Sequence, residues 1–197
     1  MINRERLIIG ITGRAGSGKS SVSNILKDQY GFYGFNTDQV GHEVLDNLAE
    51  SISKEFNLEL TPDGTVDRES LGKIVFKNPE ELQKLNRLVH PEIFNIISFR
   101  IENVDSKKVF IDAALLFEIG LDRLCGKIIR VLVNEEVAID RLQNGRGWDS
   151  EKSLSVIRTQ DTLLCNTEHA DFILDNSGDQ KLLKEKIEWI LNQCGIL

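Results

Sequence analysis

A glycine-rich segment near the start of the chain limits the folds that this sequence can adopt. Residues 13–20 read GRAGSGKS, which matches the phosphate-binding P-loop pattern G-x-x-x-x-G-K-S. The apolar run Leu7–Thr12 precedes this segment, and the helix-like segment Ser21–Lys27 follows it. A loop that wraps a polyphosphate brings successive backbone N–H groups close to anionic oxygens, so it needs residues without a Cβ at the closest approaches. The sequence therefore predicts a strand, a phosphate-binding loop and a helix in succession.

The end of the motif predicts how phosphates and a metal ion are held. The unpaired N–H groups and the dipole of a helix start favour phosphate, and Lys19 adds a positive charge at the outer phosphates. The Ser20 hydroxyl is placed to ligate Mg²⁺. A glycine-rich turn that matches the pattern by chance is the alternative, and the flanking strand and helix signals argue against it. The residues predicted to bind the nucleotide here are Gly13, Arg14, Ala15, Gly16, Ser17, Gly18, Lys19, Ser20 and Ser21.

Composition limits the class of protein. A chain of 197 residues, 41% hydrophobic and 28% charged, suits a single globular domain with room for an insertion. The formal charge of −7 argues against a general nucleic-acid or membrane-surface binder. No apolar run is long enough to span a bilayer and no signal-like core follows Met1, so we expect a cytoplasmic protein. Three cysteines far apart predict neither a disulfide framework nor a zinc ribbon.

Strand and helix signals alternate along the rest of the chain. A second short strand ends near Asn36–Asp38, and helical spacing follows as far as Phe56. Residues 58–67 read as a β-turn on Pro-Asp-Gly, and residues 68–104 read as successive helices cut at Pro79 and Pro91. Further strands are predicted at 108–118 and 127–134, and a last short strand with its turn at 172–178. Helices are predicted at 135–142, at 150–163 and at the C-terminus. This order predicts an α/β fold with a doubly wound parallel sheet.

Two additions to the sheet are expected within a single P-loop domain spanning residues 1–197. The helical stretch at about 39–104 exceeds what a minimal crossover requires, so we interpret it as an insertion that binds an acceptor. A lid is expected at about 141–165, where the glycine-flanked loop 144–150 carries Arg146.

The P-loop alone leaves open a GTPase switch, an ATPase motor module and a small-molecule kinase. The chain lacks the Asn-Lys-x-Asp segment that reads guanine in regulatory GTPases. A kinase needs an acceptor site, a carboxylate near the acceptor hydroxyl and a mobile lid that carries arginine. Asp38, the helical insertion and the Arg141–Arg146 region provide candidates for these three parts.

Several blocks of sequence resemble the dephospho-CoA kinase family, in order and over nearly the whole chain. They accompany the P-loop and Asp38 and comprise Asp63–Thr65 with Leu71, 74–80 (IVFKNPE), 85–91 (LNRLVHP), 112–118 (DAALLFE) and 170–178 (ADFILDNSG). The resemblance implies that ATP phosphorylates the ribose 3′-hydroxyl of dephospho-CoA, with Mg²⁺ as cofactor. The implied partners are small molecules rather than nucleic acid or membrane, and the implied state is a monomer or a weak homo-oligomer.

The resemblance also assigns roles to residues. Asp38 matches the proposed catalytic carboxylate, which orients a poorly nucleophilic ribose hydroxyl and accepts its proton. Lys19, Arg141 and Arg146 would stabilise the developing charge. A helix-capping Asp38, a solvated Arg141 and structural histidines are the alternative interpretations. Asn176 is expected to contact the nucleotide, and the residues expected to contact the acceptor are Asp38, His42, Arg87, His90, Leu116 and Glu118.

The chain departs from the family pattern in four places. Asn36 stands where an aspartate is common, and Ala114 stands where a proline is common. In the lid, Arg146 comes about one position late between two glycines, and a basic residue usual near 166–169 is missing. Trp148 either stacks on a base or anchors the loop. Another P-loop kinase for a nucleotide or small metabolite, or a nucleotide-binding protein with an impaired lid, therefore remains an alternative function.

Overall fold

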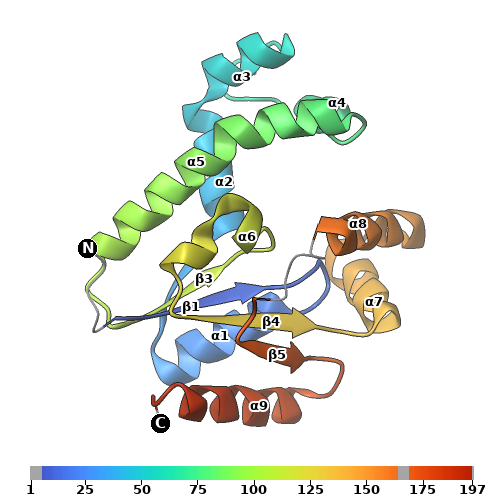
Figure 1. Cartoon of the computed structure of the whole chain (residues 1–197). Helices are drawn as coiled ribbons and strands as arrows, with labels where there is room; N and C mark the ends of the chain where they lie inside the picture. Colours follow the sequence, from blue (N-terminus) through green and yellow to red (C-terminus); the bar gives the residue numbers. More distant parts are fainter. Residues whose placement is uncertain (1–5, 164–168, 197) are drawn as a thin grey trace. The chain divides into compact units, whose positions relative to one another are not determined.

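The computed structural model describes residues 6–163 and 169–196, apart from the side chains of residues 146 and 159–163. Strands and helices alternate along this part of the chain (Figure 1). The strands are β1 (Leu7–Thr12), β2 (Tyr33–Asn36), β3 (Lys108–Asp112), β4 (Lys127–Leu132) and β5 (Phe172–Asp175). The helices are α1 (Lys19–Tyr30), α2 (Thr37–Asn47), α3 (Ala49–Phe56), α4 (Arg68–Val75), α5 (Pro79–Asn103), α6 (Leu116–Ile119), the 3₁₀ helix η1 (Leu121–Leu124), α7 (Glu135–Arg146), α8 (Ser150–Leu163) and α9 (Gln180–Gln193).

The described strands form one sheet in the order β2-β3-β1-β4-β5. The pairs β1–β3, β1–β4 and β4–β5 are parallel, and Ile9 lies opposite Phe110 on one side and Lys127 on the other. The doubly wound parallel sheet predicted from the sequence is confirmed. Because β1 lies at the centre, the loop that follows it begins in the middle of the sheet edge where ligands bind in open α/β proteins.

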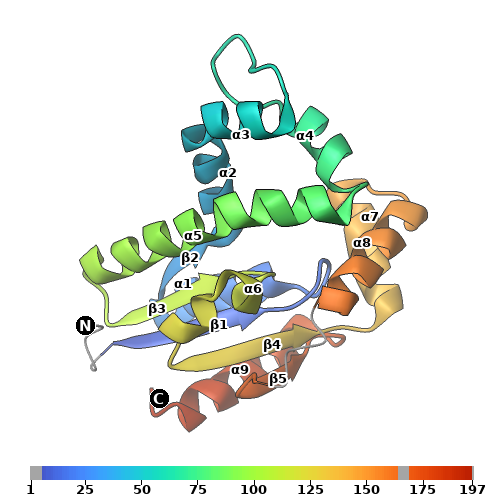
Figure 2. The same ribbon diagram turned by 45° about the horizontal axis from the view of Figure 1, so that its top comes forward.

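Helices α1 and α9 cover one face of this sheet (Figures 1 and 2). The apolar residues of α1 recur at helical spacing, and Gly31 ends the helix in the left-handed region at φ 69°. The buried residues of this layer come from β1, β4, α1 and α9 and include Ile9, Ile11, Val22, Leu26, Ile129, Val131, Leu183 and Ile187. The core therefore fixes the first turn of α1 beneath the carboxyl end of β1.

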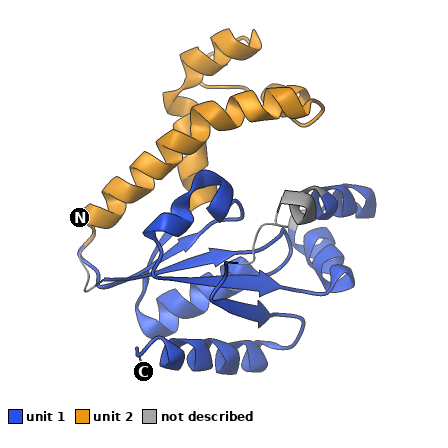
Figure 3. Ribbon diagram, in the orientation of Figure 1, with its two compact units in different colours: residues 1–35, 105–197 blue, residues 36–104 orange. Residues whose placement is uncertain are grey.

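The chain divides into two compact units (Figure 3). The first comprises residues 1–35 and 105–197 and holds the sheet. The second comprises residues 36–104 and has a core of its own, formed by Ala49, Ile52, Phe56, Val66, Leu71 and Val75.

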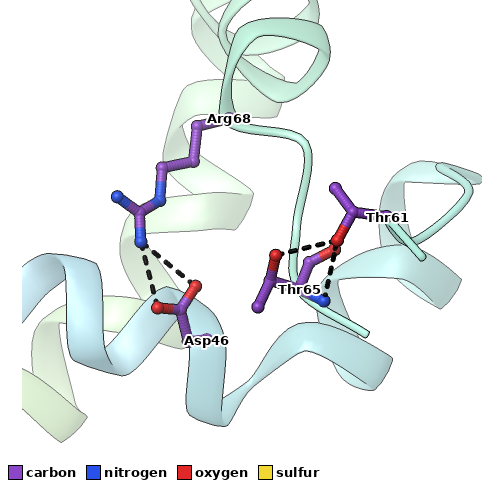
Figure 4. Close-up of polar contacts among 4 residues, drawn as sticks. All are labelled: Asp46, Thr61, Thr65 and Arg68. Carbon is purple, nitrogen blue, oxygen red and sulfur yellow. Dashed lines mark hydrogen bonds and ion pairs between the residues drawn. The ribbon is translucent and has the colours of Figure 1, made fainter. Parts of the chain in front are cut away.

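A tight turn in the second unit joins short extended pieces, as the Pro-Asp-Gly sequence predicts. Leu60 pairs with Val66 in an antiparallel bridge, and Gly64 takes φ 77°. Figure 4 shows the polar contacts near this turn: the Thr65 N–H donates to Thr61 Oγ1 over 3.2 Å. The Arg68 guanidinium reaches both carboxylate oxygens of Asp46, at 3.1 and 3.0 Å, and so ties α4 to α2.

Helix α5 corrects one prediction from the sequence. Asn78 caps its start and Pro79 is its first residue, as expected, but the helix continues through Pro91 instead of ending there. Proline removes a hydrogen bond and clashes with the carbonyl four residues earlier. The buried residues Val89, Ile93, Ile97 and Ile101 form an unbroken stripe on both sides of Pro91, and burial of this stripe outweighs the local preference.

Two other boundaries differ from the sequence prediction. The strand expected at 108–118 ends at Asp112, and Leu116–Ile119 forms helix α6, which ends at Gly120 with φ 82°. The helix expected to end near Leu142 continues to Arg146, so Gly145 and Arg146 belong to α7 and the loop begins at Gly147, at φ 66°. In both places an apolar or glycine-rich run was compatible with either structure. In α6 the burial of Leu116 favours the helix.

Within the described part of the chain, no helix combines the length and the apolar character that crossing a membrane requires. Cys125 and Cys194 are unpaired, whereas Cys165 lies outside the described residues. Burial raises the pKa of the Cys125 thiol to about 12, with smaller contributions from the Asp122 and Asp171 carboxylates. This cysteine is therefore an inert core thiol rather than a nucleophile.

Replacing Pro91 with alanine tests the account of α5. Alanine restores an N–H donor to the helix interior and relieves the clash, so Pro91→Ala is expected to raise the free energy of unfolding by about 1–3 kcal/mol. Urea unfolding followed by circular dichroism measures this change. Glu92→Ala, at the exposed next position, is the control. A Pro91→Ala variant no more stable than the wild type would contradict the interpretation.

Candidate active site

The loop between β1 and α1 has a backbone that side chains would obstruct. Gly13, Gly16 and Gly18 have φ values of 149°, 76° and 88°, in the region that favours glycine. A Cβ at each would also lie closer than 3.0 Å to a neighbour: to the Val131 carbonyl oxygen, the Ala138 carbonyl oxygen and Asn176 Nδ2, respectively. The protein's own packing therefore requires these glycines. The approach of phosphate oxygens to the loop backbone is a second reason for them.

The first turn of α1 presents polar groups at the loop. Gly18 precedes the helix, and no side chain caps its N–H groups. The Lys19 ammonium donates to the Gly13 carbonyl oxygen over 2.8 Å and lies 3.5 Å from that of Arg14. The Ser20 hydroxyl belongs to an exposed residue. Uncapped N–H groups, a helix dipole and an ammonium together form a site that favours polyanions.

Asn176 and Arg141 clasp this loop from two distant parts of the chain. The Asn176 side chain is buried and donates to the Ser17 carbonyl oxygen over 2.8 Å. Arg141, on α7, donates to the Asn176 carbonyl oxygen over 3.0 Å and to the Ser17 carbonyl oxygen over 3.4 Å. Asn176 is itself fixed by its backbone N–H, which donates to Leu132. The loop after β5, α7 and the P-loop thus form one hydrogen-bonded assembly.

Asp112 extends the site at the end of β3. Its side chain is buried, and the Ser23 hydroxyl on α1 donates to Asp112 Oδ2 over 2.8 Å. Carboxylate and hydroxyl oxygens are the ligands that Mg²⁺ prefers, usually one or two of them together with substrate phosphates. Ser20 and Asp112 therefore fit such an ion. A carboxylate at the end of an apolar strand is the signal in the sequence by which Asp112 could have been found.

Leu116 and Glu118 lie on the short helix α6. Leu116 is fully buried and packs at Gly10, where a Cβ would lie 2.8 Å from Leu116 Cδ2. Glu118 is exposed; partial desolvation raises the pKa of its carboxyl, and the Asp122 carboxylate adds to this increase. The structure thus separates the two predicted acceptor residues into a packing position and a surface position.

The second unit carries the remaining predicted acceptor residues on α2 and α5, which pack together. Asp38 lies exposed in the first turn of α2, and His42 is exposed one turn later. On α5, Arg87 is exposed and His90 is half-buried.

Asn36, rather than Asp38, caps helix α2. The Asp38 and Gln39 N–H groups donate to Asn36 Oδ1 over 2.9 and 3.2 Å. The alternative in which Asp38 serves as the helix cap is therefore not the arrangement found. The Asn36 that departs from the family pattern has a capping role in this chain.

The lid region consists of α7, α8 and the turn between them. Arg146 is the last residue of α7, and its side chain lies outside the described part of the chain, as do residues 164–168. Trp148 packs against a small apolar cluster that contains Ala15, Val133 and Ala138. The Lys152 ammonium lies 4.9 Å from the centre of the indole ring. These contacts favour the interpretation that Trp148 anchors the turn.

Comparison with known proteins gives a consistent result. The family model described as dephospho-CoA kinase matches residues 7–181. A dephospho-CoA kinase of Carboxydothermus hydrogenoformans is 36% identical over 196 residues, covering 94% of this chain and 93% of that protein. Among solved structures, TT1252 from Thermus thermophilus has a TM-score of 0.83 at 28% identity, covering 95% of this chain and 97% of its own. Dephospho-CoA kinase from Campylobacter jejuni has a TM-score of 0.70 at 25% identity, with 95% and 96% covered.

Substitution of Gly18 tests the packing of the phosphate loop. In Gly18→Ala the new methyl group meets Asn176 Nδ2 at a backbone conformation that alanine rarely adopts. The free energy of unfolding is expected to fall by more than about 1 kcal/mol. The same substitution is expected to weaken binding of a non-hydrolysable ATP analogue, which calorimetry measures. Gly145→Ala is the matched control because a Cβ there meets nothing within 4 Å; equal effects of the two substitutions would contradict the packing argument.

Proposed function

Because the chain belongs to the dephospho-CoA kinase family, we propose that it transfers the terminal phosphoryl group of ATP to the ribose 3′-hydroxyl of dephospho-CoA, giving CoA and ADP. The observation that carries the proposal is the family match over residues 7–181, which includes the P-loop, Asp38, Arg141 and Asn176. A P-loop kinase for another nucleotide or small metabolite would share the loop, but it would not account for a match of this extent.

The P-loop side of the proposal concerns the donor. The backbone of residues 13–21 surrounds the ATP phosphates, Lys19 offsets their charge, and Asn176 keeps the loop in place through Ser17. The Ser20 hydroxyl, with Asp112 nearby on β3, would hold Mg²⁺. When bound, the ion neutralises charge on the transferring phosphoryl group. Arg141, already directed at the loop, stabilises the same developing charge.

The acceptor side rests on the second unit. Within one kinase domain spanning residues 1–197, the helical segment at about 39–104 binds dephospho-CoA, and the segment at about 141–165 is the lid. Asp38 orients the ribose hydroxyl and accepts its proton, a role that its exposed position at the start of α2 permits. His42, Arg87 and His90 contribute polar contacts to the acceptor from α2 and α5, and Glu118 contributes one from α6. The buried Leu116 acts indirectly, because its packing at Gly10 holds α6 in place.

Asp38→Asn tests the proposed base. The amide keeps the shape of the side chain but accepts a proton poorly, so kcat is expected to fall by about 100-fold or more with little change in ATP affinity. A coupled assay of ADP release in the presence of Mg²⁺ and dephospho-CoA measures the rate. Glu50→Gln, another exposed carboxylate near a helix start, is the control. Full turnover by Asp38→Asn would exclude Asp38 as the base, and ADP release that depends on a different acceptor would overturn the assignment of dephospho-CoA.

Arg146→Ala tests whether the unusual lid takes part in transfer. If Arg146 stabilises the phosphoryl group, kcat at saturating ATP is expected to fall by about ten-fold or more. Arg158→Ala, an exposed arginine on α8, is the control and should retain full activity. An unchanged kcat in Arg146→Ala would remove Arg146 from the catalytic set. Tight binding of both substrates by the wild type without turnover would instead support a nucleotide-binding protein with an impaired lid.

A further inference from the structure

A cavity of about 320 Å³ lies at the carboxyl ends of β4 and β5. Its walls are the start of the phosphate loop at Gly13 and Arg14, the end of β4 with Arg130 and Leu132, the following residues Val133 and Asn134, and Asp175 at the end of β5. The proposed roles of the P-loop and the acceptor residues do not account for Arg130.

The strand register distinguishes this cavity from the α1 side of the sheet. Arg130 lies opposite Thr12 on β1, and Leu132 lies opposite Asp175 on β5. Successive residues of a strand point to opposite faces. Because Ile129 and Val131 pack into the core with α1 and α9, Arg130 and Leu132 belong to the other face. The cavity therefore adjoins the phosphate loop from the side opposite to the start of α1.

Arg130 is an unusual residue for its position. The neighbouring residues of β4 are apolar, and a guanidinium keeps its charge at any physiological pH. Its Nε is buried and, within the described part of the chain, has no hydrogen-bond acceptor. A buried donor of a charged group without an acceptor is unfavourable, and such a group in a folded protein commonly indicates a ligand or an ion.

Positive charge dominates the surroundings of the cavity. Arg14 Nη2 donates to the Val133 carbonyl oxygen over 2.8 Å, which holds a second guanidinium at the wall. The one carboxylate in the wall, that of Asp175, accepts hydrogen bonds from the Ser177 N–H and hydroxyl, and these bonds keep its pKa below the usual value. Two guanidiniums, those of Arg14 and Arg130, thus line a cavity whose one carboxylate already accepts two hydrogen bonds.

We propose that this cavity binds the phosphate group of a small phosphate-bearing anion at Arg130, next to the ATP phosphate loop, whose Gly13 and Arg14 form part of the wall. The Arg130 fork matches two oxygens of a phosphate, and the phosphate supplies the acceptor that the Arg130 Nε lacks. A volume of about 320 Å³ admits a phosphorylated metabolite but not a polymer. The proposed ligand is neither ATP nor the acceptor, so a test of this site does not depend on dephospho-CoA being the substrate.

Thermal unfolding with inorganic phosphate as the probe tests this site. The protein is first saturated with a non-hydrolysable ATP analogue and Mg²⁺, so that the phosphate loop is filled, and phosphate is compared with chloride at equal ionic strength. Binding to the folded state raises Tm in proportion to occupancy. The wild type is expected to gain several degrees more than Arg130→Met, in which only the general stabilising effect of phosphate remains.

Two further variants keep the outcome decisive. Arg123→Met removes an exposed arginine from the same unit and should retain the full phosphate-dependent shift. Arg130→Lys keeps the charge without the fork and should give an intermediate shift, and it replaces Arg130→Met if that variant does not fold. A phosphate-dependent rise in Tm that is no larger in the wild type than in Arg130→Met or Arg130→Lys would overturn the proposal.

Discussion

The close packing of the phosphate loop against other main-chain segments is the constraint on which the rest of the first unit depends. Gly13, Gly16 and Gly18 allow the loop to lie against β4, α7 and the segment after β5. Each approach uses the space that a side chain would fill. The same contacts bring Arg141 and Asn176 to the Ser17 carbonyl oxygen. The positions of β4, α7 and the phosphate loop therefore depend on the same set of packing contacts.

Local chemistry made much of the fold predictable. The P-loop pattern located β1 and α1, and Asn78 with Pro79 located the start of α5, because these signals act within a few residues. The passage of α5 through Pro91 and the formation of α6 were not predictable in this way. The first depends on burial of the stripe that includes Ile93 and Ile97, and the second depends on burial of Leu116. Such burial involves contacts distant in sequence, and it outweighs the local conformational preference.

The candidate site shows the same division. Spacing within the motif predicted the placement of Lys19 and Ser20 at the start of α1. The contact between Asn176 and Ser17 joins residues 159 positions apart, and no local pattern indicates that the amide is directed at the loop backbone. In the sequence, Arg130 is one polar residue within the strand predicted at 127–134, and nothing nearby indicates a ligand. The pairing of β4 with β1 and β5 shows that Arg130 lines a cavity.

The clasp at Ser17 also bears on the order in which the protein becomes functional during synthesis. The loop motif leaves the ribosome well before Asn176, which follows Ser17 by 159 positions, and domains fold as units when their long-range contacts become available. A nascent chain that ends within α8 carries the complete motif but lacks the amide that fixes its backbone. Formation of the fixed phosphate loop is thereby linked to synthesis of the segment that follows β5.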